Sequence, residues 1–215
     1  MIISHGRRYI FVHIPKTGGT ALATALEARA LADDILIGDT PKAQARRRRL
    51  QGAQTAGRLW KHATLADAIG LITPDQARAY FTFTLVRNPW DRMVSYYHWL
   101  RVQRFAHPHV ALAQALDFSA FLNAPVTQAA IAAAPYASYV TLPLMGECCR
   151  AFLRLEHLAQ DAADLQAHLG FVLPALPRLN VSDREADWRG YYSKADAALV
   201  GRLCAADVAR FGYRF

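Results

Sequence analysis

The chain has little cysteine and no long apolar run. Its three cysteines, Cys148, Cys149 and Cys204, are too few and too unevenly spaced for a disulfide framework, and they form no C-x-x-C zinc pattern. We expect two buried small residues and a third in a helix, in a reducing compartment. No stretch of about 18 apolar residues predicts a membrane span, and the first residues lack the pattern of a signal peptide. The sequence thus predicts a soluble, cytoplasmic protein.

Acidic residues are in the minority, with 17 Asp and Glu against 25 Lys and Arg, and the net charge is +8. This surplus favours anionic partners such as nucleotides, nucleic acids, or sulfated or phosphorylated sugars. A hydrophobic content of 53% over 215 residues excludes disordered and collagen-like proteins. With no repeat and no linker in the sequence, we predict a single domain over residues 1–215.

Apolar runs rich in β-branched and aromatic residues alternate with helical patterns along the chain. Strands are predicted at residues 7–14, 80–86 and 149–155. Helices are predicted at residues 21–31, 91–103, 117–123, 156–169 and 193–212, and residues 124–143 are predicted to be irregular. This alternation predicts an α/β fold of three layers, in which helices flank a central parallel sheet.

The loop that follows the first predicted strand, PKTGGT at residues 15–20, has the composition of an anion-binding loop. Gly18 and Gly19 let the backbone approach a ligand closely. N–H groups at the start of the next helix favour negative charge. The charged and hydroxyl donors are Lys16, Thr17 and Thr20. We interpret the loop as a phosphate or sulfate site, and the alternative is an ordinary strand-to-helix turn.

Several known nucleotide and catalytic motifs are missing. The nucleotide-triphosphate loop G-x-x-x-x-G-K-[ST] places its lysine after the glycines, whereas Lys16 precedes them. A kinase or an ATPase is therefore less favoured. The dinucleotide pattern G-x-G-x-x-G and the catalytic patterns H-E-x-x-H and G-x-S-x-G are also absent from the sequence.

A second polar loop, RNPWDRMVSYY at residues 87–97, follows the second predicted strand. Arg87 can donate two hydrogen bonds to a phosphate, and Ser95 can add a hydroxyl two helical turns later. Trp90 is interpreted as a packed wall or as a stacking platform for a base. A structural arginine at the sheet edge is the alternative. Because ligands of parallel sheets bind at the carboxyl ends of the strands, both loops are expected to face one crevice.

FVHIPKTGGT followed by TLVRNPWDRMVSYY resembles the two signatures of the sulfotransferase superfamily, and of its carbohydrate (family 2) branch in particular. The resemblance implies a P-loop-like fold. It also implies transfer of the sulfuryl group of 3′-phosphoadenosine 5′-phosphosulfate (PAPS) to a carbohydrate, glycolipid or small-molecule hydroxyl or amine, without a metal. The residues that it implies for the 5′-phosphosulfate are Lys16, Thr17, Gly18, Gly19 and Thr20, and those for the 3′-phosphate are Arg87 and Ser95.

The same resemblance implies a catalytic histidine between the two signatures, where His62 stands in WKHATLADAIGLI. We predict that His62 takes the acceptor proton and that Lys16 neutralises the charge that develops on the leaving oxygen. His98 is a second candidate for the base, and a structural role for His62 is the alternative. Relatives often carry histidine where Arg178 stands, so the role of that loop is open.

Two further functions stay open at this stage. One is a phosphotransferase that uses the same loop for ATP, and the other is a non-catalytic binder of anionic polymers. The run Arg46–Arg49, in a basic segment at residues 38–61 that we expect to be exposed, either grips an anionic acceptor or forms a solvated helix face. Aromatic residues do not interleave with basic ones, so no nucleic-acid partner is expected. A homodimer is left open, with residues 104–146 as the expected acceptor or dimer region.

Overall fold

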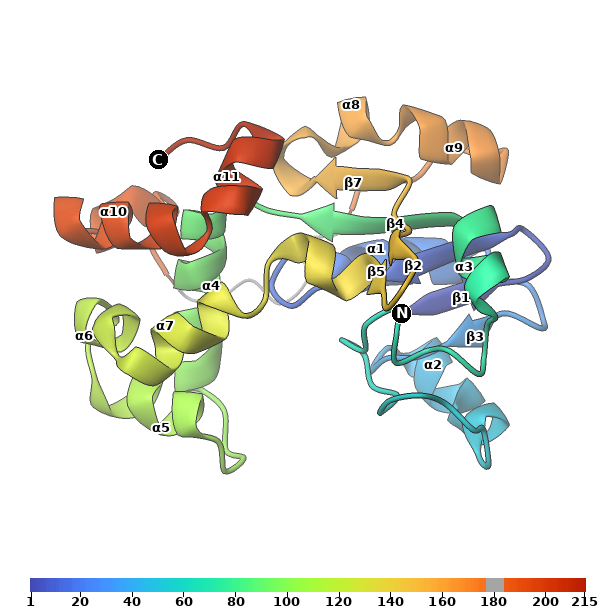
Figure 1. Cartoon of the computed structure of the whole chain (residues 1–215), viewed down its shortest axis with the longest axis horizontal. Helices are drawn as coiled ribbons and strands as arrows, with labels where there is room; N and C mark the ends of the chain where they lie inside the picture. Colours follow the sequence, from blue (N-terminus) through green and yellow to red (C-terminus); the bar gives the residue numbers. More distant parts are fainter. Residues whose placement is uncertain (177–183) are drawn as a thin grey trace. The chain divides into compact units, whose positions relative to one another are not determined.

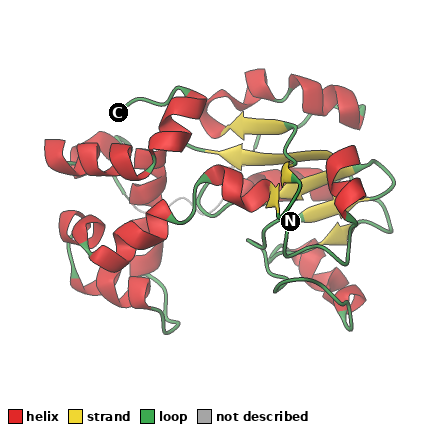
Figure 2. Cartoon of the chain, viewed as in Figure 1, coloured by secondary structure: helices red, strands yellow, loops and turns green. Residues whose placement is uncertain are grey.

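The computed structural model describes residues 1–176 and 184–215. Its contacts divide the chain into two compact units that interleave in the sequence. The first unit comprises Met1–Val86 and Tyr136–Leu179, and the second comprises Arg87–Pro135 and Asn180–Phe215. The single domain stays a prediction. All strands of the described residues fall within the ranges of the first unit, and Figures 1 and 2 show the course of the strands and helices along the chain.

A five-stranded sheet forms the centre of the first unit, in the strand order β3-β1-β2-β4-β7. The strands are β1 (Ile2–Ser4), β2 (Tyr9–Val12), β3 (Ile35–Leu36), β4 (Phe81–Val86) and β7 (Ala151–Arg154). β4 runs parallel to both β2 and β7, so the predicted parallel centre is confirmed. β1 pairs antiparallel with β2 and β3, an edge that the sequence did not predict, because strands of two or three residues show no measurable period.

Helices and loops cover both faces of this sheet. Alternate strand residues point to opposite faces, and Tyr9 and Phe11 share a core cluster with residues of α1 (Gly19–Glu27) and α9 (Ala163–Leu169). Ile10 and Val12 pack instead with residues of the 63–80 segment, which includes α3 (Pro74–Ala79), and of η2 (Tyr136–Val140). The predicted arrangement of helices flanking a sheet is therefore confirmed in this unit.

The remaining elements of the first unit include one place where the predictions need correction. The basic segment forms α2 (Pro41–Arg46) and η1 (Arg47–Leu50), and β5 (Thr141–Leu142) pairs with β6 (Gly146–Glu147). The helix predicted over 156–169 is broken into η3 (Leu155–His157), α8 (Leu158–Asp161) and α9. The carboxylate of Asp161 accepts hydrogen bonds from the main-chain N–H and from the guanidinium of Arg154, the last residue of β7. Gly170 ends α9 at a φ of 72°, as the glycine predicted.

The second unit is helical, with α4 (Pro89–Arg101) at its centre. Around it lie α5 (Pro108–Ala115), α6 (Phe118–Asn123), α7 (Pro125–Ala132), η4 (Trp188–Tyr191), α10 (Lys194–Leu203) and α11 (Ala205–Phe211). The prediction of irregular structure over 124–143 is wrong at α7, because Pro125 stands at its first turn, where proline is tolerated, and alanines follow. The last predicted helix is interrupted at Cys204, which ends α10 and precedes α11. Within the described ranges, no helix combines the length and apolar character needed to cross a membrane.

Candidate functional site

The loop between β2 and α1 has the backbone of an anion nest. Lys16 and Gly18 adopt the left-handed conformation, with φ of 65° and 86°. Such alternation turns successive N–H groups toward one side. Among the residues that the structure describes, the N–H groups of Thr17, Gly18, Gly19 and Thr20 donate no hydrogen bond. These N–H groups lie at the positive end of the α1 dipole, where an anion is stabilised.

The two threonines of this loop have different roles. Thr17 is fully buried, and its hydroxyl donates to the main-chain oxygen of Ile14 at 2.9 Å. The expectation that this hydroxyl faces a ligand therefore needs correction: it holds the turn, and only the Thr17 N–H stays a candidate donor. Thr20, in the first turn of α1, is half-buried. Its hydroxyl stays a candidate ligand donor.

The two glycines are required for different reasons. A Cβ on Gly19 would lie 2.1 Å from Cδ2 of His13, so the His13 ring fills the space of a side chain there. Gly18 has a positive φ, which L-residues avoid, and a Cβ there would lie 2.9 Å from Cδ1 of Leu155. The loop is therefore packed closely against β2 on one side and against the end of β7 on the other.

His62 lies in the first unit, and the main chain of His13, the residue directly after β2, orients its ring. Its Nδ1 atom is 2.9 Å from the carbonyl oxygen of His13. Because a carbonyl oxygen only accepts, Nδ1 carries the hydrogen and Nε2 keeps its lone pair. The ring meets His13 and Trp60 edge-on, with centroid distances of 4.7 and 5.1 Å.

The environment of His62 favours the neutral imidazole. Burial lowers the pKa of His62 to about 4, the hydrogen bond to His13 acts in the opposite direction, and the charge of Lys61 lowers it further. The pKa of His13 is also lowered, well below its usual value, chiefly by burial. His62 is therefore uncharged near neutral pH and can accept a proton at Nε2.

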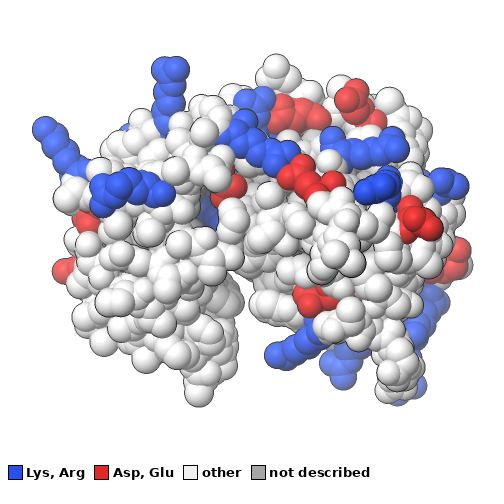
Figure 3. Space-filling model, viewed as in Figure 1, with Lys and Arg blue, Asp and Glu red and all other residues white. Residues whose placement is uncertain are grey.

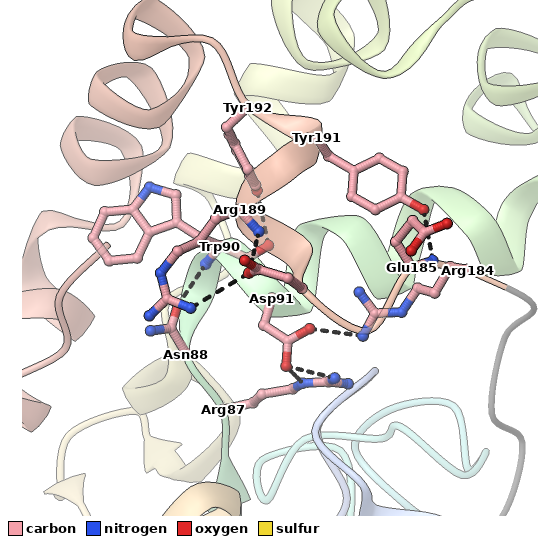
Figure 4. Close-up of polar contacts among 10 residues, drawn as sticks. Arg87, Asn88, Trp90, Asp91, Arg184, Glu185, Arg189, Tyr191 and Tyr192 are labelled. Carbon is pink, nitrogen blue, oxygen red and sulfur yellow. Dashed lines mark hydrogen bonds and ion pairs between the residues drawn. The ribbon is translucent and has the colours of Figure 1, made fainter.

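Arg87, the first residue after β4, belongs to an ion cluster of the second unit (Figure 4). Its Nε and Nη2 atoms lie 2.8 and 2.6 Å from Oδ2 of Asp91, one helical turn later. Arg184 reaches the other carboxylate oxygen of Asp91 at 2.7 Å. Asp91 therefore holds two guanidinium groups near the start of α4.

Arg184 is the functional candidate that sequence reasoning missed. It lies 93 residues from Asp91 along the chain, and no motif marks it. One of its Nη atoms is buried and has no hydrogen-bond partner among the described residues. Only the fold of the second unit, in which η4 lies close to α4, brings Arg184 to the start of α4.

The other predicted residues of the second unit lie on α4. Ser95 is four residues after Asp91, on the same helical face, and is 8% exposed. Trp90 is buried, and its indole nitrogen donates to Ala197 at 2.9 Å, so it is a packed wall and not a stacking platform. His98 meets Tyr191 edge-on at 5.1 Å. Arg178 lies outside the described residues.

The structure thus groups the predicted residues into two sets. Lys16, the rest of its loop and His62 are brought together in the first unit through His13. In the second unit, Arg87 pairs with Asp91, and Ser95 follows Asp91 by four residues along α4.

Comparisons with known proteins identify the family of this chain. A family model described as "Sulfotransferase family" matches residues 1–168. Among solved structures, the mouse sulfotransferase SULT7A1 complexed with PAP is similar in fold, with a TM-score of 0.50 and 15% sequence identity, over 93% of this chain and 83% of that one. A search of curated proteins found no match.

Proposed function

Because the chain belongs to the sulfotransferase family, we propose that it transfers the sulfuryl group of PAPS to a hydroxyl of a carbohydrate, a glycolipid or a small molecule. The observation that carries this proposal is the pairing of an open backbone nest with a neutral histidine in one unit. The PAP in the similar mouse enzyme, which we read as adenosine 3′,5′-bisphosphate, supports PAPS as the donor of the sulfuryl group.

The loop at residues 15–20 fits the phosphosulfate end of PAPS. Its unbonded N–H groups and the start of α1 would hold the anionic oxygens, and Gly18 and Gly19 keep side chains out of their approach. PAPS supplies an activated sulfuryl group with a phosphate as its leaving group. Lys16 would neutralise the charge on the oxygen that bridges sulfur and phosphorus, as preorganised cations do in phosphoryl transfer.

His62 would act as the general base. As the acceptor oxygen bonds to sulfur, its proton moves to Nε2 of His62, and the bond between sulfur and the bridging oxygen breaks. The Nδ1–H bond to the His13 carbonyl fixes the ring and stabilises the imidazolium that results.

Arg87, Arg184 and Ser95 would bind the 3′-phosphate. Asp91 holds both guanidinium groups in place, and guanidinium groups bind phosphate through paired hydrogen bonds. The buried Nη atom of Arg184, which has no hydrogen-bond partner among the described residues, is a donor that such a ligand would satisfy.

A thermal-shift titration with adenosine 3′,5′-bisphosphate tests this proposal, with magnesium-ATP titrated in parallel. At about a hundred times its dissociation constant, a ligand stabilises the fold by ~2.7 kcal/mol, which raises the melting temperature by several degrees. We expect this shift with the bisphosphate and expect it to disappear in Arg87→Ala. A shift with magnesium-ATP alone would contradict the proposal and favour a phosphotransferase. The activity itself is tested by transfer of radiolabelled sulfate from PAPS to a panel of glycans and alcohols.

A further inference from the structure

A cavity of about 620 Å³ lies in the first unit, and two of its lining residues, Trp60 and Lys61, immediately precede His62. Residues from the end of β3, α2, η1 and the segment before His62 line it, including Arg47, Arg48, Arg58, Trp60 and Lys61. We propose that this cavity, called the basic cavity below, binds the acceptor and selects a saccharide that carries carboxylate or sulfate groups. The inference rests on the proposed function, since it names the acceptor class for that site.

The arginine run divides into two pairs. Arg46 donates to the main-chain oxygens of Leu31 and Asp34 at 2.8 and 3.1 Å, and Arg49 donates to the main-chain oxygen of Ala32. These two arginines attach the α2–η1 segment to the loop before β3. The middle pair, Arg47 and Arg48, lines the cavity and is exposed. The outer pair therefore holds the segment while the middle pair faces a ligand.

The lining of the basic cavity has a surplus of positive charge. Four of its residues are cationic, and one, Asp39, is anionic and pairs with Lys61 at 2.6 Å. Among the described residues, Arg47, Arg48 and Arg58 form no ion pair. Figure 3 shows Lys and Arg side chains gathered over the α2 end of this unit. Guanidinium groups without a carboxylate partner bind planar anionic groups through paired hydrogen bonds.

Trp60 belongs both to the lining of the basic cavity and to the surroundings of His62. It lines the cavity, is 47% exposed and meets the edge of the His62 ring at 5.1 Å. An exposed indole face is a flat apolar surface with a polar rim, against which a sugar ring can pack. A saccharide that packs on Trp60 with its anionic groups on Arg47 and Arg48 would lie next to the residue that we propose as the base.

The dimensions and charges favour a short acidic saccharide over other anions. The cavity volume lies within the ~300–1,000 Å³ of ordinary ligand pockets, so it accepts a few sugar rings and not a polymer. Trp60 is the one aromatic side chain in its lining, whereas single-stranded nucleic acids are bound on successive stacking platforms. The acidic saccharide is therefore the occupant that the lining fits.

Binding to the full-length protein tests the proposal. The ligands are a glucuronate-containing tetrasaccharide, a sulfated tetrasaccharide, a neutral glucose tetrasaccharide and a single-stranded RNA octamer, titrated by calorimetry. The variants are Arg47→Gln/Arg48→Gln and a control of equal charge, Arg150→Gln/Arg202→Gln, whose arginines are exposed and outside the cavity. We expect at least tenfold weaker binding of an acidic tetrasaccharide to the first variant, no change in the control, and little binding of the neutral sugar. The carboxylated and sulfated ligands distinguish which anionic group is selected.

Two outcomes would overturn the proposal. One is an equal loss of affinity in the control variant, which would indicate a general charge effect, and the other is tighter binding of the RNA octamer or of the neutral sugar. Titration with the bisphosphate on the same samples separates the two proposals. If the bisphosphate fails to bind while the acidic sugar binds through Arg47 and Arg48, the basic cavity is supported and the proposed function is contradicted.

Discussion

The Nδ1 atom of His62 lies 2.9 Å from the carbonyl oxygen of His13, and the ring of the same His13 fills the space where Gly19 would carry a side chain. One residue therefore orients the proposed base with its main chain and shapes the anion-binding loop with its ring.

The pH dependence of the reaction should report the lowered pKa of His62. The neutral imidazole is the active form, and it is lost as the pH falls through the pKa of about 4. We expect kcat/KM to stay level from pH 8 to about pH 5 and to fall below that, because this parameter reports the free enzyme. An acid limb near pH 6.5, the ordinary value for histidine, would contradict the burial of His62.

Replacement of His62 should remove the base and leave the nucleotide site. We expect His62→Gln to lower kcat by at least ~100-fold, the usual contribution of general-base catalysis, with unchanged affinity for adenosine 3′,5′-bisphosphate. The matched control is His157→Gln, since His157 is exposed. Full activity in His62→Gln would assign the proton transfer to another residue, and His98→Gln would be tested next.

Loss of the Lys16 cation should slow the chemical step more than it weakens binding. We expect Lys16→Gln to lower kcat at least ~100-fold, which corresponds to the ~2.7–4 kcal/mol that one preorganised donor contributes. Affinity for PAPS should fall less than tenfold, because the charge that Lys16 neutralises develops on the bridging oxygen only as the bond from that oxygen to sulfur breaks. Single-turnover rates and calorimetry separate the two effects, and Lys194→Gln, on the exposed first turn of α10, is the control. A loss confined to binding would contradict this role.

The contact between Gly19 and His13 should appear as a coupling free energy. Gly19→Ala places a Cβ 2.1 Å from the His13 ring, and we expect the free energy of unfolding to fall by about 1–3 kcal/mol, as for other overpacked sites. The double variant His13→Ala/Gly19→Ala should regain stability relative to the sum of the single changes. Urea unfolding of the four proteins measures the coupling, and strict additivity would show that the ring does not constrain Gly19.

Arg87 and Arg184 should recognise the 3′-phosphate in particular. We expect Arg87→Gln and Arg184→Gln each to weaken adenosine 3′,5′-bisphosphate binding about tenfold or more, the usual scale for a lost hydrogen bond to a charged group. Adenosine 5′-monophosphate, which lacks the 3′-phosphate, should bind all variants alike. Arg189→Gln serves as the control because that side chain is 54% exposed and pairs with Asp187. Equal losses for both nucleotides would place the two arginines elsewhere.

The sequence predicted the parallel centre of the sheet and the loop at residues 15–20, because long β-branched runs and paired glycines leave local signals. It missed Arg184, since the ion pair with Asp91 is made only by the tertiary fold. The sequence could not predict that the Thr17 hydroxyl donates a hydrogen bond to the main-chain oxygen of Ile14. A loop threonine that holds a turn and one that binds a ligand look alike in sequence. The outer and middle pairs of Arg46–Arg49 have different roles because main-chain carbonyl groups lie near the outer pair only. The sequence shows four like charges and cannot show which of them meet a carbonyl group.

The different contacts of the outer and middle arginines in Arg46–Arg49 have a consequence for engineering and for evolution. Because Arg46 and Arg49 attach the segment to neighbouring carbonyl groups, Arg47 and Arg48 can change without loosening it. If the basic cavity binds the acceptor as we propose, two adjacent codons set the preference for acceptor charge, while the fold and the nucleotide loop stay as they are. A library restricted to these two positions would be a short route to transferases for neutral or cationic acceptors.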